Sequence, residues 1–317
     1  MRYIESFREG MHVSDVFLCK NRQICLTKSG KEYGNLLLQD KTGTVDAKIW
    51  DLGSPGIGNF EALDYVFIDA DVTVFQNSNQ LNIKRIRKAE EGEYIPGDYL
   101  PVSSKNIDAM YEELSAFIRS LKDPYLKKLL ESFFVDDLEF AKGFRFHSAA
   151  KSVHHGFVGG LLEHTLGVVK LCDYYASNYP LINRDLLLTA AMFHDIGKTR
   201  ELSVFPENDY TDDGQLLGHI IIGTEMVGER IRTINGFPEK TASELKHCIL
   251  AHHGELEYGS PKKPALIEAL ALNLADNTDA KMETIIEVLK GAGDNNGWLG
   301  YNRLMETNIR KTTQSFL

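Results

Sequence analysis

The pattern of apolar and polar residues changes once along the chain, near residue 90. Before that point apolar residues alternate with polar ones, as in Gly43–Trp50, where every second residue from Val45 to Ile49 is apolar. Such alternation predicts a β-strand with one buried and one wetter face. Five strands are expected, at residues 13–26, 33–40, 43–50, 65–75 and 81–87.

Turn-forming residues join these predicted strands. The tetrapeptides DKTG at 40–43 and QNSN at 76–79 each separate two strands and predict β-hairpins. A segment containing glycine and proline, Gly53–Gly58, separates the third strand from the fourth. Five strands connected in this way are typical of a small closed β-barrel.

The second part of the chain has a helical pattern. From Asn106 onward apolar residues recur with helical spacing and without strand-like alternation, and a polar stretch with breakers, EEGEYIPG at 90–97, precedes it. The sequence predicts a multidomain α+β protein with a β-barrel at 1–90, a linker at 91–105 and an all-α domain at 106–317. The tail, residues 290–317, is expected to end in a short helix and is a candidate element for forming a homo-oligomer.

Composition adds an expectation about location. The chain has 317 residues, of which 43% are hydrophobic and 25% charged, as in ordinary soluble proteins. No apolar run approaches the ~20 residues needed to cross a bilayer, and the N-terminus, MRYIESFREGM, has acidic residues where a signal peptide would be apolar. A cytoplasmic protein without a membrane partner is expected. The four cysteines form no CxxC pair, which argues against a zinc knuckle.

The net charge of −10 lies entirely in the second part of the chain. Residues 1–90 contain 12 Lys and Arg against 12 Asp and Glu, which leaves 23 against 33 for residues 91–317. Binding of nucleic acid by bulk charge is therefore not expected of the helical domain. An acidic domain can still act on phosphates if bound cations supply positive charge locally.

Several predicted helices end their apolar stripe in a histidine. Leu187, Ala191 and His194 share one helical face, and Asp195 follows directly. A buried imidazole beside a carboxylate is a natural pair of ligands for a divalent cation. A lone histidine on an apolar face is usually a core residue, but here four predicted helices each contribute one, so a metal site is the better interpretation. The candidate ligands are His164, His194, Asp195, His219, His252, His253 and Asp276.

These residues carry a family resemblance. The series of histidines, the HDIGK motif at 194–198 and the final aspartate together resemble the HD-domain metal-dependent phosphohydrolases. The stretches AAKSVHHGFVGGLLEHT, LLGHIIIG and LAHHGELEYGSPKKP more narrowly resemble the YhaM-type 3′→5′ exoribonucleases, which join an OB-fold to an HD domain. In the first domain, LLLQDKTGTVDAKIWD resembles a nucleic-acid-binding OB-fold. The resemblance therefore covers nearly the whole chain.

The resemblance implies roles for single residues. It implies that one metal is held by His164, His194, Asp195 and Asp276. It implies that Asp195 bridges to a second metal held by His219 and His252, with His253 as an alternative or additional ligand. Manganese is favoured, and iron, cobalt, nickel or zinc would also suit these ligands. Asp195 and Lys198 are the expected catalytic residues, with Lys198 facing a phosphate.

Candidate substrate contacts lie in both domains. His154 and His155 precede the first predicted ligand and are candidates either for contact with a phosphate or for a structural role at the helix entry. An OB barrel takes single strands by base stacking and a shallow basic groove. The candidates there are Tyr33, Lys48, Trp50 and Phe75, with packing at the barrel rim as the alternative for the aromatic side chains.

The expected activity is a metal-dependent 3′-5′ exonuclease that hydrolyses single-stranded RNA to nucleoside 5′-monophosphates, with single-stranded DNA as a second candidate substrate. The first alternative is an HD phosphohydrolase of a nucleotide or cyclic dinucleotide with a regulatory OB domain. The segment after His253, GELEYGSPKKP, departs from the GYP signature of the cyclic-dinucleotide branch and disfavours that alternative. The second alternative is a non-enzymatic OB-type nucleic-acid-binding protein, against which the complete set of ligands counts.

Overall fold

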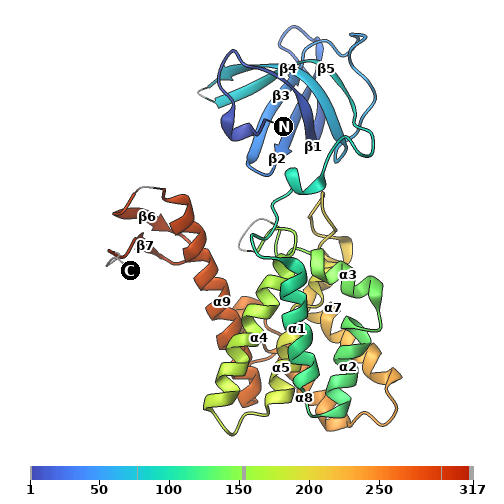
Figure 1. Cartoon of the computed structure of the whole chain (residues 1–317), viewed down its shortest axis with the longest axis vertical. Coiled ribbons are helices and arrows are strands. Elements are labelled where there is room, and N and C mark those ends of the chain that lie inside the picture. Colours follow the sequence, from blue (N-terminus) through green and yellow to red (C-terminus); the bar gives the residue numbers. More distant parts are fainter. Residues whose placement is uncertain (1, 77, 152–154, 294, 314–317) are drawn as a thin grey trace. The chain divides into compact units, whose positions relative to one another are not determined.

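The computed structural model describes residues 2–76, 78–151, 155–293 and 295–313 (Figure 1). The chain divides into two compact units. Unit 1 comprises Met1–Val102 with Phe205–Glu207, and unit 2 comprises Ser103–Val204 with Asn208–Leu317.

Unit 1 is a closed five-stranded barrel. Its strands are β1 (His12–Leu26), β2 (Glu32–Asp40), β3 (Gly43–Ile49), β4 (Tyr65–Phe75) and β5 (Ser78–Lys88). They are ordered β1-β2-β3-β5-β4, and β4 pairs again with β1 to close the barrel. Only the β3–β5 pairing among these strands is parallel. The predicted OB-type barrel is therefore confirmed, and β5 begins at Ser78, earlier than expected, because Ser78 already pairs with Phe75 of β4.

Alternation places the barrel core. In β3 the apolar side chains of Val45, Ala47 and Ile49 are buried, while their polar neighbours lie on the wetter face. The segment predicted as a linker begins with residues that pack on the same unit, since Tyr94 stacks on Tyr65 with ring centroids 3.9 Å apart.

Unit 2 is a bundle of helices. These are α1 (Ile107–Ser120), α2 (Pro124–Phe134), α3 (Leu138–Phe146), α4 (Gly160–Asn178), α5 (Arg184–Phe193), α6 (Lys198–Glu201), α7 (Asp212–Thr233), α8 (Glu239–Leu250) and α9 (Ile267–Gly291). Helix α4 is central and packs against α1, α5 and α9 (Figure 1). Its burial on nearly all sides places side chains of its first turns in the interior of the bundle.

Polar caps begin several of these helices. The side chains of Asn106, Asp123, Asp137 and Asn183 accept hydrogen bonds from free N–H groups in the first turns of α1, α2, α3 and α5. Apolar residues on the inward face of these helices fill the core, among them Leu114, Phe144 and Leu187, each fully buried. None of the described helices is both long and apolar enough to cross a membrane.

The end of the chain differs from the prediction. After α9 two short antiparallel strands, β6 (Trp298–Asn302) and β7 (Thr307–Arg310), form a hairpin (Figure 1). Residues 295–313 contain no helix, so the short helix expected there is wrong, and so is the expected absence of strands after Asn106. Glycines at 291, 293, 297 and 300 disfavour continuation of a helix, and Gly300 has a φ of +96°, which is suited to the irregular register of this hairpin. Most side chains of both strands are exposed, so no alternation of burial marked them in the sequence.

Candidate metal centre

The side chains predicted as ligands converge inside unit 2. His164 lies on the second turn of α4, His194 is the C-cap of α5, and Asp195 follows it. His219 comes from α7, and Asp276 from the middle of α9. His252 and His253 follow the end of α8. Segments up to 112 residues apart in sequence thus bring imidazole and carboxylate groups to one place.

The first half of the centre, which we call the α4 half, contains His164, His194 and Asp276. The Nε2 atoms of His164 and His194 are 3.1 Å apart. Oδ1 of Asp276 lies 3.2 Å from Nε2 of His164 and 3.9 Å from Nε2 of His194. Oδ2 of Asp195 lies 3.4 Å from each of these two nitrogens. The Nε2 atoms of both histidines therefore have one oxygen of Asp276 and one of Asp195 within 4 Å.

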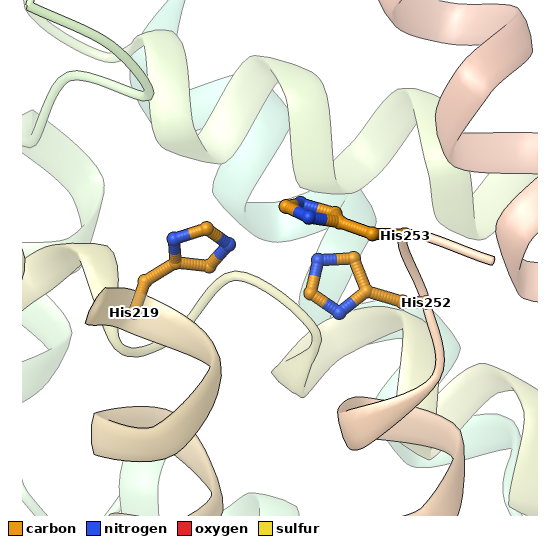
Figure 2. A group of neighbouring side chains, drawn as sticks. All are labelled: His219, His252 and His253. Atoms are coloured by element: carbon orange, nitrogen blue, oxygen red, sulfur yellow. The ribbon is translucent and has the colours of Figure 1, made fainter. Parts of the chain in front are cut away.

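The second half, which we call the α7 half, contains His219, His252 and His253. Figure 2 shows the three rings turned toward one another, one from α7 and two from the segment after α8. Their ligand nitrogens all lie within 4.8 Å of one another. Oδ1 of Asp195 is 3.4 Å from Nε2 of His219 and 3.8 Å from Nε2 of His252. Asp195 therefore presents one carboxylate oxygen to each half.

Hydrogen bonds at Nδ1 determine which nitrogen of each ring is available. Nδ1 of His194, His252 and His253 faces a main-chain carbonyl oxygen, that of Ala191, Ile249 and Tyr258 respectively, at 2.7, 2.7 and 2.9 Å. Nδ1 of His164 and of His219 faces a carboxylate, that of Asp279 at 2.7 Å and that of Glu201 at 3.0 Å. Because these oxygens only accept, each Nδ1 carries a proton, and Nε2 is the nitrogen of each ring that can bind a cation once it is unprotonated.

Two nitrogens of the centre are buried without a hydrogen-bond partner in the described part of the chain, as a metal ligand would be before the cation binds. Nε2 of His219 and Nε2 of His252 are buried and have no hydrogen-bond partner among the described residues. A buried polar atom without a partner is costly unless something else satisfies it. Neutral imidazole nitrogens beside carboxylates are the ligands that first-row divalent metals accept. The residues present therefore fit divalent cations.

Charges around Asp195 and Lys198 reinforce each other. Burial raises the pKa of Asp195, but the Lys198 ammonium and the neighbouring histidines outweigh burial and hold that pKa well below its usual range. Burial lowers the pKa of Lys198, but Asp195 outweighs it and raises the pKa. Nζ of Lys198 lies 2.6 Å from Oδ2 of Asp195. At neutral pH the pair is a carboxylate and an ammonium.

His252 is held neutral. Burial, with the nearby His194, lowers the pKa of His252 well below its usual range. Burial also lowers the pKa of His253. Both rings are therefore unprotonated at Nε2 near neutral pH, as a metal ligand must be.

Two residues of the centre were missed by the sequence analysis, Asp279 and Glu201. Asp279 lies one turn after Asp276 on α9, and Glu201 lies one turn after Lys198 on α6. Their spacing from a predicted site residue, i+3 on the same helical face, is a signal that could have indicated them. Taken alone, an acidic residue at this spacing is as typical of a solvated helix face.

Of the two histidines before α4, the structure describes His155 but not His154. His155 is buried, and its Nε2 lies 3.2 Å from Oδ2 of Asp279, which places it behind His164. His154 lies outside the described residues. The phosphate contact predicted for these residues stays a prediction.

On the barrel, three of the four predicted substrate contacts lie together. The rings of Tyr33 and Trp50 stack with centroids 5.2 Å apart, and Nζ of Lys48 lies 6.0 Å from the centre of the Tyr33 ring. Trp50 is 46% exposed. Phe75 is 60% exposed at the far end of β4, and no described ring contact joins it to the other two aromatic residues.

Comparison with known proteins identifies the class. Residues 161–281, which contain every candidate ligand together with Glu201 and Asp279, match the family described as HD domain. With its buried histidines and aspartates on converging helices, unit 2 contains an HD domain at residues 161–281, and the chain is a hydrolytic enzyme of the divalent-metal-dependent HD class.

Relatives identify the family. The chain is 34% identical to a 3′-5′ exoribonuclease YhaM of Bacillus velezensis over 86% of each chain. It is 33% identical to the Geobacillus sp. protein of the same name, over 90% of this chain and 88% of that one, and 32% identical to the Listeria innocua protein, over 90% of each. The chain belongs to the YhaM family.

One solved structure, the second OB-fold domain of replication protein A from Methanococcus maripaludis, aligns with 29% of this chain and 96% of its own. The sequence identity is 14% and the TM-score 0.23, and a likeness this low adds nothing to the assignment.

Proposed function

We propose that the protein is a divalent-metal-dependent 3′-5′ exoribonuclease that releases nucleoside 5′-monophosphates from single-stranded RNA. The observation that carries this proposal is the position of Asp195, which presents one oxygen to the α4 half and the other to the α7 half. The relatives named 3′-5′ exoribonuclease YhaM support the substrate and the direction of attack.

We propose that each half holds one cation. His164, His194 and Asp276 would bind the cation of the α4 half, and the three histidines of Figure 2 the cation of the α7 half. Asp195 would bind both. Two carboxylates and five imidazoles suit manganese first and also iron, cobalt, nickel or zinc.

The reaction breaks the bond between phosphorus and the O3′ of the preceding nucleotide. When bound, a pair of divalent cations supplies an acidified water as nucleophile and positive charge beside the phosphoryl oxygens. Lys198, an ammonium next to Asp195, adds a further positive charge where the phosphate becomes more negative. The leaving O3′ takes up a proton, so the released nucleotide keeps a 5′-phosphate and the shortened RNA ends in a 3′-hydroxyl.

The barrel would supply affinity for the RNA. The stacked pair of Tyr33 and Trp50 lies on the β2–β3 face with Lys48 beside it. Aromatic rings stack on any base, and a lysine attracts the backbone phosphates. Such a surface binds single strands without requiring a particular sequence.

A labelling experiment tests the proposal. The wild-type protein is incubated with manganese and a 5′-labelled single-stranded RNA, and a cyclic dinucleotide is tested beside it. We expect a descending ladder that ends in short labelled products, and no cleavage of the dinucleotide. Asp195→Asn should reduce turnover at least ~10²-fold, since removal of one group that stabilises transition-state charge typically costs that much.

The matched control is Glu283→Gln, which removes a carboxylate from α9 outside the centre and should leave turnover unchanged. Immediate release of a labelled mononucleotide would reverse the proposed direction. Cleavage of the dinucleotide alone, or an RNA gel shift without cleavage, would refute the proposed activity.

A further inference from the structure

The five imidazoles of the centre differ in what lies behind them. Three of them, His194, His252 and His253, donate Nδ1–H to a neutral main-chain carbonyl. The other two donate to a carboxylate, and these two are divided evenly, with His164 in the α4 half and His219 in the α7 half. Each half therefore contains one imidazole with a negative charge behind it.

In the α4 half that charge is Asp279. Its Oδ2 lies 2.7 Å from Nδ1 of His164 and 3.2 Å from Nε2 of His155, so two buried imidazoles hold one oxygen. Its Oδ1 lies over Gly167, one turn further along α4. A Cβ on Gly167 would lie 2.2 Å from that oxygen, so only a glycine lets Asp279 approach α4 this closely.

In the α7 half the charge is Glu201. One oxygen of Glu201, Oε1, accepts from Nδ1 of His219 at 3.0 Å and from the main-chain N–H of the same residue at 2.9 Å. Both the ring and the backbone of His219 are therefore fixed by a single carboxylate. The residue before it, Gly218, has a φ of +74°, which turns the chain so that the N–H points at Glu201.

A carboxylate behind an imidazole has two physical effects. It fixes the tautomer and the orientation of the ring, and it raises the electron density at Nε2. A neutral carbonyl does the first but contributes less to the second. The two carboxylate-backed histidines are therefore expected to be the strongest imidazole ligands of their halves.

We propose that Asp279 and Glu201 are positioning residues that set the metal affinity of the α4 half and of the α7 half, each acting on its own half. This inference rests on the proposed function, because it requires that the centre holds two cations. Under this proposal the metal affinity of each half depends on a carboxylate of its own, although both halves share Asp195.

Manganese binding tests the inference without reference to catalysis. Equilibrium binding of manganese to the wild-type protein, Asp279→Asn and Glu201→Gln gives the number of ions and the affinity of each step. Each substitution keeps the size of the side chain and removes its charge. We expect each variant to weaken one binding step by about 10- to 100-fold, as loss of such a partner typically does, and to leave the other step nearly unchanged.

A background without His164 shows which half each residue serves. In a His164→Ala protein, Asp279→Asn should have little further effect on manganese binding, while Glu201→Gln should still weaken it. Gly167→Ala provides a second route to the same disturbance, because the added methyl group displaces Asp279, and it should resemble Asp279→Asn. Glu283→Gln, one turn further along α9, is the control and should bind manganese as the wild type does.

The outcomes separate this inference from the proposed function. If both variants weaken both steps alike, or if neither changes either step, the inference is refuted. If the wild type binds two ions but leaves RNA intact, only the proposed activity fails, and the isotherms still decide the roles of Asp279 and Glu201. A wild type that binds neither manganese nor iron, cobalt, nickel or zinc refutes both. Circular dichroism of each variant identifies a loss of binding caused by unfolding, and Gly167→Ala then decides the case for Asp279.

Discussion

At the scale of single residues, the centre depends on which atom each side chain uses. Each of the five imidazoles of the centre donates Nδ1–H to an oxygen and directs Nε2 toward the interior of the centre. Asp195 presents one oxygen to each half. An amide at Asp195 could offer only one oxygen, so it could not serve both halves. The function of the centre therefore depends on the position of individual atoms, and a residue of similar size that lacks the right atom cannot replace a ligand.

His147 offers a test of buried ionisation away from the centre. Burial lowers the pKa of His147 below its usual value of 6.5. As pH falls through about 6.5, His147 becomes protonated in the unfolded chain but stays neutral in the folded chain. The unfolded state is therefore favoured, and the contribution of this residue to stability is lost on acidification. We expect His147→Asn, whose amide can still donate to the Ser148 carbonyl as Nδ1 does, to show a flatter decline in the free energy of unfolding between pH 7.5 and 5.5.

The measurement is urea unfolding at several pH values with a chelator present. The difference in slope has an upper limit of about 1.4 kcal/mol per pH unit for one proton. The histidines of the metal centre titrate in both proteins, so their contribution cancels in the comparison. Equal slopes in the two proteins would show that His147 takes up its proton in the folded state.

The ligand histidines could be predicted from sequence, and the residues behind them could not. His194 and His252 end apolar stripes, so periodicity indicated that they face the interior. Asp279 and Glu201 contact His164 and His219, which come from other helices, and the i+3 spacing within one helix does not identify such partners. That distinction is physical: helical spacing reports the buried face, while a hydrogen-bond partner is a property of the assembled fold.

At the scale of elements, α7 is the helix whose shape matters most. Its dihedral angles leave the helical region at Gly218, with φ of +74° and ψ of 157°, directly before His219. This is a region that essentially only glycine occupies. The kink lets α7 begin at its cap, Thr211, and still present His219 to Asp195.

Gly218→Ala should therefore be harmful in two ways. We expect a loss of about 1–3 kcal/mol in the free energy of unfolding from backbone strain, and weaker manganese binding in the α7 half, since His219 would be displaced. Chemical denaturation and manganese titration provide the two measurements.

The control is Gly228→Ala, ten residues further along the same helix. There the nearest atom to an added Cβ is 3.9 Å away, and the backbone is regular helix. Alanine should stabilise this position by roughly 0.5–1 kcal/mol. An equal effect of both substitutions would contradict the role given to the kink.

Most elements followed from their patterns, with the last hairpin as the exception. The barrel strands have one buried face, so their alternation was visible, as in Val45, Ala47 and Ile49. In β6 no side chain is buried, and in β7 only Ile309 is, so burial imposes no period on those residues. The glycines before β6 and within it were the remaining sequence signal for this hairpin, and they indicated only that a helix would end.

At the scale of the whole molecule, we propose that unit 1 binds the RNA and unit 2 carries out the hydrolysis. We expect Trp50→Ala to raise KM for single-stranded RNA by roughly 5- to 150-fold and to leave kcat at saturating RNA unchanged. The range corresponds to the ~1–3 kcal/mol that stacking of one base on an aromatic ring contributes. Steady-state kinetics on a labelled RNA measures both constants.

Trp298→Ala is the matched control, since Trp298 is also exposed but lies on β6 in unit 2. It should change neither constant. A fall in kcat with an unchanged KM for Trp50→Ala would show that the barrel acts on the chemical step and would contradict this division.

The placement of the chain's two tryptophans also has a spectroscopic consequence. Trp50 stacks on Tyr33 in the barrel and Trp298 stands on the terminal hairpin, so each unit contains one indole. Intrinsic fluorescence of the protein is therefore the sum of two emitters in separate units. With Trp298 replaced by phenylalanine, quenching of the remaining emission by an added oligonucleotide would report occupancy of the barrel alone, in solution and without a label.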